Sequence, residues 1–265
     1  MSSFLDAIIE GVREDVIERA IPIAQLRAQL SEAADLRGAR RALTGTNLKI
    51  IAEVKRASPS KGDLSSITDP AKLAAQYEEG GASIISVLTE QRRFKGSIRD
   101  FLAVRSEVST PMLRKDFIVT EYQLIESRIL GSDLLLLIVA GLTQSQYVDF
   151  HQMANELGMD VLVEIHNEEE LERALEVDPA IIGVNARNLK TLEVNPSAFD
   201  QLLPMIPAGV LRVAESGISE REEVVKVTEL GANAILVGET LVKAGDPVAA
   251  ISRLLGLSAT GTFDQ

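Results

Sequence analysis

Ionisable side chains stand at the ends of several apolar, β-branched segments of this chain. Glutamates occur within IIAEVK (Glu53), at the end of VLVE (Glu164) and in VAES (Glu215), where a strand buried on both faces should be apolar. Lys55 and Lys115 stand at comparable places. One such carboxylate could equally pair with a lysine for structural reasons, but several that converge on one place favour function. Together they predict a pocket in which lysine and glutamate exchange protons with a substrate.

A second group of residues could bind an anion. The segment 54–62, VKRASPSKG, joins three cations to serines directly after the first apolar segment, although alone it could be an exposed basic turn. AESGIS and LVGETL offer glycine-flanked backbone N–H groups of the kind that hold phosphate, with ordinary turn glycines as the alternative. Because a carboxylate repels a phosphate, we expect Glu239 to serve only through its backbone N–H. These segments predict a phosphorylated small-molecule ligand.

Eight apolar segments alternate with stretches of helical periodicity, and this alternation must position the polar residues. The expected strands are 49–54, 84–88, 111–113, 134–139, 160–163, 181–184, 211–214 and 234–237. The expected helices are 70–79, 97–108, 121–130, 144–157, 168–176, 196–205, 220–230 and 247–254. An open, doubly wound sheet would alternate in the same way, but eight units within 48–257 favour an α/β fold of the closed (β/α)8 TIM-barrel type. In such a barrel, the polar ends of the strands meet at one mouth.

The two ends of the chain do not fit this repeat. Residues 1–47 are expected to form an N-terminal helical extension, with helices over 4–20 and 23–34, that packs over one mouth of the barrel. Residues 48–257 are expected to form the catalytic barrel. The tail at 258–265 is small and polar, so we expect it to be flexible.

Composition excludes several kinds of site. The chain has no cysteine, which removes disulfides, thiolate nucleophiles, iron–sulfur clusters and cysteine-bound zinc. Its only histidines, His151 and His166, are both expected at the surface. We therefore expect no metal site and no histidine-based triad.

The balance of charge bears on partners and location. Lys and Arg number 27 against 39 Asp and Glu, a formal net charge of −12, so we expect neither nucleic acid nor membrane as a partner. The N-terminus lacks the uninterrupted apolar core of a signal peptide, and the longest apolar run, 134–140, is too short to span a bilayer. We expect a cytoplasmic protein.

Motifs in all eight units carry a family resemblance. They are IIAEVKRASPSKG, SVLTEQRRFKGS, LRKDFIV, LLLLIVA, VLVEI, IGVNARNL, VAESGIS and AILVGETLV. In these motifs the chain resembles the indole-3-glycerol-phosphate synthase family, barrel enzymes of tryptophan biosynthesis, and EVKRASPSKG with KDF and AESGI is a highly specific combination. The resemblance implies a decarboxylating carbon–carbon lyase that closes 1-(o-carboxyphenylamino)-1-deoxyribulose 5-phosphate to indole-3-glycerol phosphate with loss of CO2 and water. It implies no metal and no organic cofactor.

The resemblance also implies roles for individual residues. Lys115 in KDF would be the general acid, Glu164 in VLVEI the general base, and Lys55 a contact to the substrate carboxylate and phosphate that can itself donate a proton. The orienting groups would be Glu53, Asn185 and Ser216, with Arg187 and Glu215 as support. Phosphate would be bound by Ser58, Gly217, Gly238 and the backbone at Glu239. The anthranilate ring would lie among Phe94, Phe117, Leu136 and Leu189.

Two other functions share parts of this pattern. Phosphoribosylanthranilate isomerase, another phosphosugar barrel, should use a Cys and Asp pair, and this chain has no Cys. A non-catalytic sensor of phosphorylated ligands would be favoured by loss of the strand-end lysines, and both are present. The chain departs from the family's commoner GINNRDL pattern at Ala186 and Asn188, on either side of Arg187. This departure bears on how Arg187 is held in place and does not affect the catalytic pair.

The chemistry and the partners give two further expectations. A lysine pKa near 10.4 is high for proton donation at neutral pH, so we expect the crowding of Lys55 and Lys115 in a partly desolvated pocket to lower the pKa of one of them. We expect a monomer or a weak homodimer, with enzymes of the tryptophan pathway as candidate partners.

Overall fold

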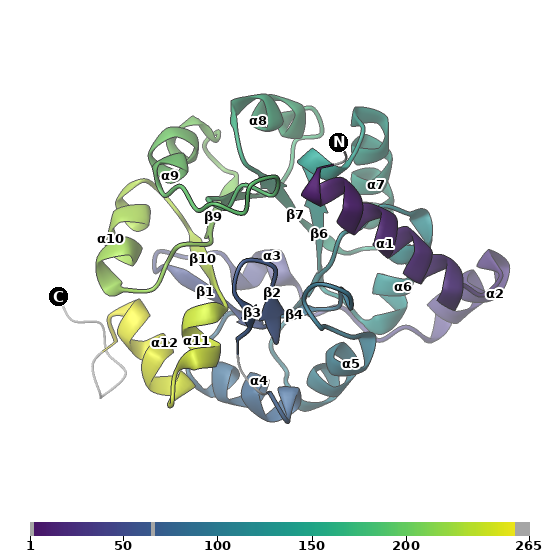
Figure 1. The fold of residues 1–265 in the computed structure, drawn as a ribbon, viewed down its shortest axis with the longest axis horizontal. Helices are drawn as coiled ribbons and strands as arrows, with labels where there is room; N and C mark the ends of the chain where they lie inside the picture. The colour runs from purple at the N-terminus through teal and green to yellow at the C-terminus, as the bar shows by residue number, and fades with distance from the viewer. Residues whose placement is uncertain (1–2, 65–66, 258–265) are drawn as a thin grey trace.

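Eight parallel strands close into a barrel in the computed structural model, which describes residues 3–64 and 67–257 (Figure 1). The strands of the barrel are β1 (Lys49–Val54), β4 (Ile84–Leu88), β5 (Met112–Lys115), β6 (Leu134–Ile138), β7 (Asp160–Ile165), β8 (Ile181–Asn185), β9 (Leu211–Glu215) and β10 (Ala234–Val237). Each strand pairs with its neighbours in chain order, and β1 closes the ring by pairing with both β10 and β4. The expected (β/α)8 fold is therefore confirmed, whereas the tail expected at 258–265 lies outside the described residues.

The strands are buried on both faces. Every residue of β4, β6 and β10 is buried, because inward side chains fill the barrel and outward ones pack under the helices. The strands β5, β7, β8 and β9 run one or two residues further than the sequence predicts. The polar ends stay in the ladder, where Asn185 is paired with Glu215 and Lys115 with Leu88. Backbone pairing therefore carries these polar side chains as far as the mouth.

Helices on the outside of the barrel link successive strands and form the outer ring in Figure 1. They are α4 (Pro70–Glu79), α5 (Ile98–Glu107), α6 (Glu121–Leu130), α7 (Gln144–Glu156), α8 (Glu168–Leu175), α9 (Ser197–Leu202), α10 (Arg221–Glu229) and α12 (Pro247–Leu255), with short 3-10 helices η2 (Val139–Gly141) and η3 (Leu203–Met205). Several begin at a side-chain cap, as at Asp69, Thr120 and Asn167, each of which accepts a backbone N–H three residues later. None of the helices in the described ranges is long and apolar enough to cross a membrane.

One long helix and several short ones precede the barrel. They are α1 (Phe4–Arg19), α2 (Ile23–Ala28), η1 (Gln29–Glu32) and α3 (Ala39–Ala42). The helix α1 packs against η2 and crosses in front of the ring near β6 and α6 (Figure 1), and it buries Leu5, Ile8 and Val12 on one face. The helix expected over 23–34 is shorter, since α2 ends at Ala28 and a 3-10 turn follows.

Two small elements at the mouth were not expected from the sequence. β2 (Ala57–Ser58) and β3 (Gly62–Asp63) form a hairpin after β1, which Figure 1 shows in front of the centre of the ring. The helix α11 (Glu239–Lys243) follows β10 directly. Both are too short to produce a recognisable hydrophobic period.

The surface positions expected for the two histidines are wrong. His151 on α7 is buried, and its ring lies 6.1 Å from that of Tyr147. The side chain of His166, one residue past β7, is only 9% exposed because it lies between Glu164 and Glu170. The sequence pattern could not reveal the contacts of His166, because they join a residue at the end of β7 to a residue of the following helix.

Candidate active site

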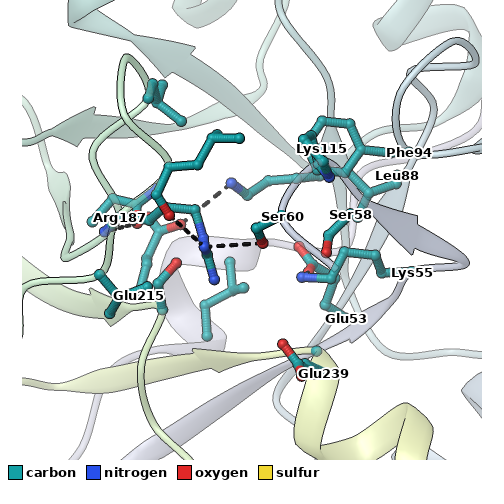
Figure 2. Close-up of a pocket in the computed structure, with 18 of the residues that line it drawn as sticks. Glu53, Lys55, Ser58, Ser60, Leu88, Phe94, Lys115, Arg187, Glu215 and Glu239 are labelled. Atoms are coloured by element: carbon teal, nitrogen blue, oxygen red, sulfur yellow. Dashed lines mark hydrogen bonds and ion pairs between the residues drawn. The ribbon is translucent and has the colours of Figure 1, made fainter. Parts of the chain in front are cut away.

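A cavity of about 470 Å³ opens at the carboxyl ends of the strands. Its volume is in the range of small-molecule sites. Every residue that the sequence assigned to the site lines it: Glu53, Lys55, Ser58, Phe94, Lys115, Phe117, Leu136, Glu164, Asn185, Arg187, Leu189, Glu215, Ser216, Gly217, Gly238 and Glu239. Phe4 and Ile8 of α1 line it as well, so the N-terminal helix forms part of the wall. Figure 2 shows the charged side chains pointing into this space from different strands.

Lys115 is enclosed by carboxylates from other strands. Its Nζ lies 3.0 Å from Oε2 of Glu164 and 3.4 Å from Oε2 of Glu215. Burial alone would lower the pKa of the Lys115 ammonium, but Glu164, Glu215 and Glu53 outweigh it and raise this pKa above its usual range. The expected lowering is therefore wrong for Lys115. The free site keeps this lysine charged, as a proton donor must be.

Glu164 is ionised by the cations that surround it. Burial by itself would raise the pKa of this carboxyl, but Lys115 and His166 together hold it well below its usual range. Nε2 of His166 lies 3.3 Å from Oε1 of Glu164, at ion-pair distance but without the alignment of a hydrogen bond. The carboxylate is thus available to accept a proton, and His166 is a contact that sequence analysis missed.

Glu215 differs from its neighbour in charge state. Burial, opposed in part by Lys115 and reinforced by Glu164 and Glu53, raises the pKa of this carboxyl to about 8. Neither of its oxygens has a hydrogen-bond partner within the described part of the chain, although Lys115 is within ion-pair distance. Gly183 on β8 makes room for this side chain, because a Cβ there would stand 2.1 Å from Oε1 of Glu215. Glu215 can therefore hold a proton at neutral pH.

Lys55 and Glu53 form a second pair, which lies apart from the Lys115 cluster in Figure 2. Nζ of Lys55 is 2.7 Å from Oε1 of Glu53, whose side chain is buried. The absence of a side chain at Gly238 gives this carboxylate its space, since a Cβ there would approach Oε1 to 2.5 Å. The two lysines are thus held by separate carboxylates.

Other residues of the mouth have the features of an anion site. Ser216 and Gly217 both have left-handed backbones, φ 69° and 74°, an unusual conformation for serine that tightens the turn after β9. The hydroxyl of Ser58 is buried and has no hydrogen-bond partner among the described residues. Such a hydroxyl is free to bind a ligand oxygen.

Two lysines neutralise Glu239: Lys61, one of the three cations of segment 54–62, and Lys243, which the sequence did not single out. Nζ of Lys61 and Nζ of Lys243 each lie 2.7 Å from Oε1 of this carboxylate, at the mouth of the cavity. They lower the pKa of Glu239, although burial acts the other way. The repulsion expected between Glu239 and a phosphate is therefore offset by two cations, and Lys61 adds a further charge from the hairpin loop.

An apolar wall completes the cavity. The rings of Phe94 and Phe117 lie 6.2 Å apart and are tilted by 37°. The backbone N–H groups of the loop before Phe94 donate to the carboxylate of Glu90, which holds that loop in place. Leu136 and Leu189 face the same space. A flat aromatic ring could lie against this wall.

Arg187 is braced mainly by backbone groups and by one serine. Its Nη1 donates to Oγ of Ser60 at 3.1 Å and to the carbonyl of Leu192 at 2.9 Å, as Figure 2 shows for the serine. The backbone N–H of Arg187 donates to Oδ1 of Asn185. The side-chain oxygen of Asn188 accepts the backbone N–H groups of Lys190 and Thr191 in its own loop. The arginine therefore ties the loop after β8 to the hairpin after β1.

The chemistry open to this arrangement is proton transfer on an anionic substrate. A charged lysine and an ionised glutamate face each other at 3.0 Å beside an anion site and an aromatic wall. Within the described ranges, no group of three or more His, Asp or Glu side chains is placed to hold a metal ion.

Comparisons with known proteins agree with this chemistry. A family model described as indole-3-glycerol phosphate synthase matches residues 5–254. Proteins with that name from Paenarthrobacter aurescens and a Nocardioides species are 55% and 50% identical to the chain, over 92% and 97% of it and 92% and 100% of their own lengths. Among solved structures, a 3-hexulose-6-phosphate synthase gives a TM-score of 0.60 at 17% identity, covering 79% of this chain and 99% of that one. A tryptophan synthase complex from Pyrococcus furiosus gives 0.59 at 19%, covering 79% and 98%. These two structures share the fold alone, but the family model and the sequence relatives show that the chain belongs to the indole-3-glycerol phosphate synthase family.

Proposed function

We propose that this protein closes 1-(o-carboxyphenylamino)-1-deoxyribulose 5-phosphate to indole-3-glycerol phosphate, with loss of CO2 and water, as a step in tryptophan biosynthesis. The buried pair of Lys115 and Glu164, 3.0 Å apart in the cavity, is the observation that carries the chemistry. Membership of the family supplies the substrate.

The cavity has a place for each part of this substrate. The phosphate would lie at the ends of β9 and β10, on the backbone of Ser216, Gly217 and Gly238. The buried hydroxyl of Ser58, which has no hydrogen-bond partner in the part of the chain that the structure describes, lines the same cavity. The anthranilate ring would lie against Phe94 and Phe117, with Leu136 and Leu189 on the same wall. This orientation directs the ketone towards the lysines in the middle of the mouth.

Lys115 acts as the acid of the first step. When the ring carbon that bears the carboxylate attacks the ketone, the carbonyl oxygen gains charge and becomes more basic than an amine. The Lys115 ammonium then gives it a proton, even though neighbouring carboxylates raise the pKa of that ammonium. CO2 leaves next, and its bonding electrons restore the aromatic ring.

Glu164 acts as the base of the dehydration. The hydroxyl leaves as water after it takes a second proton, while Glu164 accepts a proton from carbon. The contact between Glu164 and Lys115 lets the abstracted proton return to the lysine. Because the carboxylate departs as CO2, each turnover takes one further proton from solvent.

The remaining charged groups orient and neutralise the substrate. Lys55, held by Glu53, would contact the substrate carboxylate and is a second candidate donor. Asn185 and Ser216 would orient the reacting groups, and Arg187 would close the hairpin loop over them through Ser60. Glu215, which holds a proton in the free site, would keep Lys115 in place.

Replacing Lys115 by Ala tests this function. The wild-type protein mixed with the carboxyphenylamino-deoxyribulose phosphate should develop indole fluorescence. K115A should lose turnover while binding of the product indole-3-glycerol phosphate, measured by calorimetry, survives. Near-normal turnover by K115A would remove the lysine from its role, and a wild type that forms no indole would overturn the function.

The charge of the protein and its family bear on its cellular setting. We propose a cytoplasmic enzyme that acts without a nucleic-acid or membrane partner, which its net charge of −12 supports. We further propose a monomer or weak homodimer that works beside other enzymes of the tryptophan pathway. Light scattering over a range of concentrations, alone and with those enzymes, measures both.

A further inference from the structure

His166 joins the ionised carboxylate of the site to a second carboxylate outside it. Nε2 of His166 lies 3.3 Å from Oε1 of Glu164, and Nδ1 lies 2.8 Å from Oε2 of Glu170 in the first turn of α8. The backbone N–H of His166 donates to the same oxygen of Glu170, also at 2.8 Å. The imidazole is not among the groups that line the cavity. It therefore reaches the substrate only through Glu164.

We propose that His166, held by Glu170, is a positioning residue that fixes the carboxylate of Glu164 in the orientation needed for proton abstraction. The inference rests on the proposed function, because that function makes Glu164 the base. It assigns a role in the same reaction to two residues, His166 and Glu170, that do not touch the substrate.

The division of the two Glu164 oxygens supports this role. Lys115 takes Oε2 and His166 lies next to Oε1, so the two cations fix the plane of the carboxylate from different sides. With His166 neutral or absent, both oxygens are free to turn towards Lys115. A carboxylate that can rotate towards Lys115 no longer holds an oxygen in a fixed direction, and a proton is abstracted efficiently only from a fixed geometry.

The charged groups around His166 keep it protonated at neutral pH. Burial would lower the pKa of its imidazole, but Glu164 and Glu170 outweigh burial and raise this pKa to about 9. Glu164 in turn faces Lys115 of β5, and beyond that lysine lie Glu215 of β9 and Glu53 of β1. The imidazolium charge is therefore present at neutral pH and is lost near pH 9.

A purely structural contact would behave differently. If His166 only tied β7 to α8, its replacement would lower stability without changing the pH at which activity falls. If it positions Glu164 through its charge, activity should decline as His166 loses its proton, and the midpoint of that decline should follow any change at Glu170. Two of the three carboxylates in the first turn of α8 offer a matched pair, since Glu169 is exposed and Glu170 contacts the imidazole.

Titration by NMR tests the charge directly and without substrate. The chain has only two histidines, so loss of one signal in His151→Asn identifies the signal of His166. We expect the His166 signal to titrate well above pH 6.5, and E170Q and E164Q each to lower its midpoint by about one pH unit. E169Q should leave it unchanged. An ordinary midpoint near 6.5 in the wild type, or one insensitive to both variants, would overturn the inference even if the protein forms indole.

Kinetics test the consequence. H166Q should lower kcat roughly ten-fold with little change in KM, less than the 10²- to 10⁴-fold that a general base supplies. In the wild type, kcat should fall as pH rises through about 9. E170Q should move that fall to lower pH, whereas E169Q should not. If H166Q does not fold, E170Q still decides the matter, and an unshifted profile in E170Q with normal kcat would contradict the role. A wild type that forms no indole would instead remove the proposed function and leave the NMR result standing.

Discussion

Three carboxylates and two lysines share the centre of the site, and their distances decide which of them carry protons. Lys115 sits between Glu164 and Glu215 and stays charged, whereas Glu215, with the higher pKa, can remain neutral. Pairs of like groups whose surroundings separate their pKa values are typical of acid–base sites. Here Lys115 and His166 both lower the pKa of Glu164, whereas burial and the charges of Glu164 and Glu53 raise that of Glu215.

Replacing Glu164 by Gln should separate catalysis from binding. The amide keeps the size of the side chain but accepts no proton, so kcat should fall by roughly 10²-fold or more. KM should change little, because the phosphate and ring contacts remain. Steady-state kinetics followed by indole fluorescence give both constants. A rise in KM at constant kcat would make Glu164 a binding residue instead.

Substitution of Gly183 should reduce activity as much as substitution of a charged residue of the site. An alanine there would place its Cβ 2.1 Å from Oε1 of Glu215 and 3.2 Å from Leu162 of the barrel interior. We expect G183A to lose activity and to be destabilised by about 1–3 kcal/mol through overpacking. Gly245 is the control, because a Cβ there meets nothing within 4 Å. Equal activity in G183A and G245A would show that Glu215 moves aside without cost.

At the scale of single residues, the sequence predicts which residue types form the site but not their charge states. Lysine and glutamate at strand ends were enough to expect Lys115 and Glu164 in one cavity. The raised pKa of Lys115 was not predictable, because it depends on distances to three carboxylates from different strands. The contacts of Lys61 and Lys243 with Glu239 were missed for a similar reason, since the two lysines come from a hairpin and a short helix.

At the scale of elements, a buried arginine joins β5, α6 and α1. Arg114 is fully buried, and its Nη2 lies 2.8 Å from Glu126 of α6 and 3.3 Å from Asp116. The other oxygen of Glu126 accepts from Arg19 at the end of α1, also at 2.8 Å. Since Lys115 follows Arg114 directly, this network fixes both the strand that carries the acid and the helix that walls the cavity.

Breaking this network should be costly. R114M leaves Asp116 and part of Glu126 without their cation, so the free energy of unfolding should fall by roughly 3–5 kcal/mol. Urea denaturation measures it. K226M removes an exposed pair, Lys226 with Asp200, and should cost at most about 1 kcal/mol. Similar losses in the two variants would mean that the buried network adds nothing beyond a surface pair.

The sequence predicted correctly the helices and strands that have a long apolar period. It did not predict the polar ends of the strands or the shortest elements. All eight strands were expected, but β5 and β7 extend two residues further because backbone pairing with the neighbouring strand continues into the polar mouth. The helix α11 and the hairpin of β2 and β3 have too few residues for a period. These missed elements line the mouth of the cavity, whereas α3, which the sequence also missed, does not.

At the scale of the whole molecule, an acidic protein binds an anionic substrate by local arrangement of its cations. The net charge is −12, yet Lys55, Lys61, Lys243 and Arg187 all line the same mouth. Each is held there by a named partner, a carboxylate or, for the arginine, a serine and a carbonyl. The surface discourages nonspecific anions, and the closed ring of strands brings the scattered cations of the sequence together.

The stability of the folded protein should fall between pH 6.5 and 9. A group whose pKa is raised by folding stabilises the native state fully below its unfolded pKa and loses this contribution as the pH rises through its folded value. His166, raised from 6.5 to about 9, and Glu215, raised from 4.5 to about 8, both act in this direction. For His166 alone the change is of the order of 3 kcal/mol across this window.

Variants of the two groups locate the source of this slope. The free energy of unfolding, measured in urea at a series of pH values, should decline less steeply above pH 6.5 in H166Q and in E215Q than in the wild type. H151N is the control. Because burial lowers the pKa of His151, this residue changes the free energy of unfolding only as the pH falls below 6.5, and it has no effect between pH 6.5 and 9. Wild-type stability that is flat or rises from pH 6.5 to 9 would contradict the raised pKa values. A slope that persists in both variants would place its origin in the general repulsion of an acidic surface, which also grows with pH.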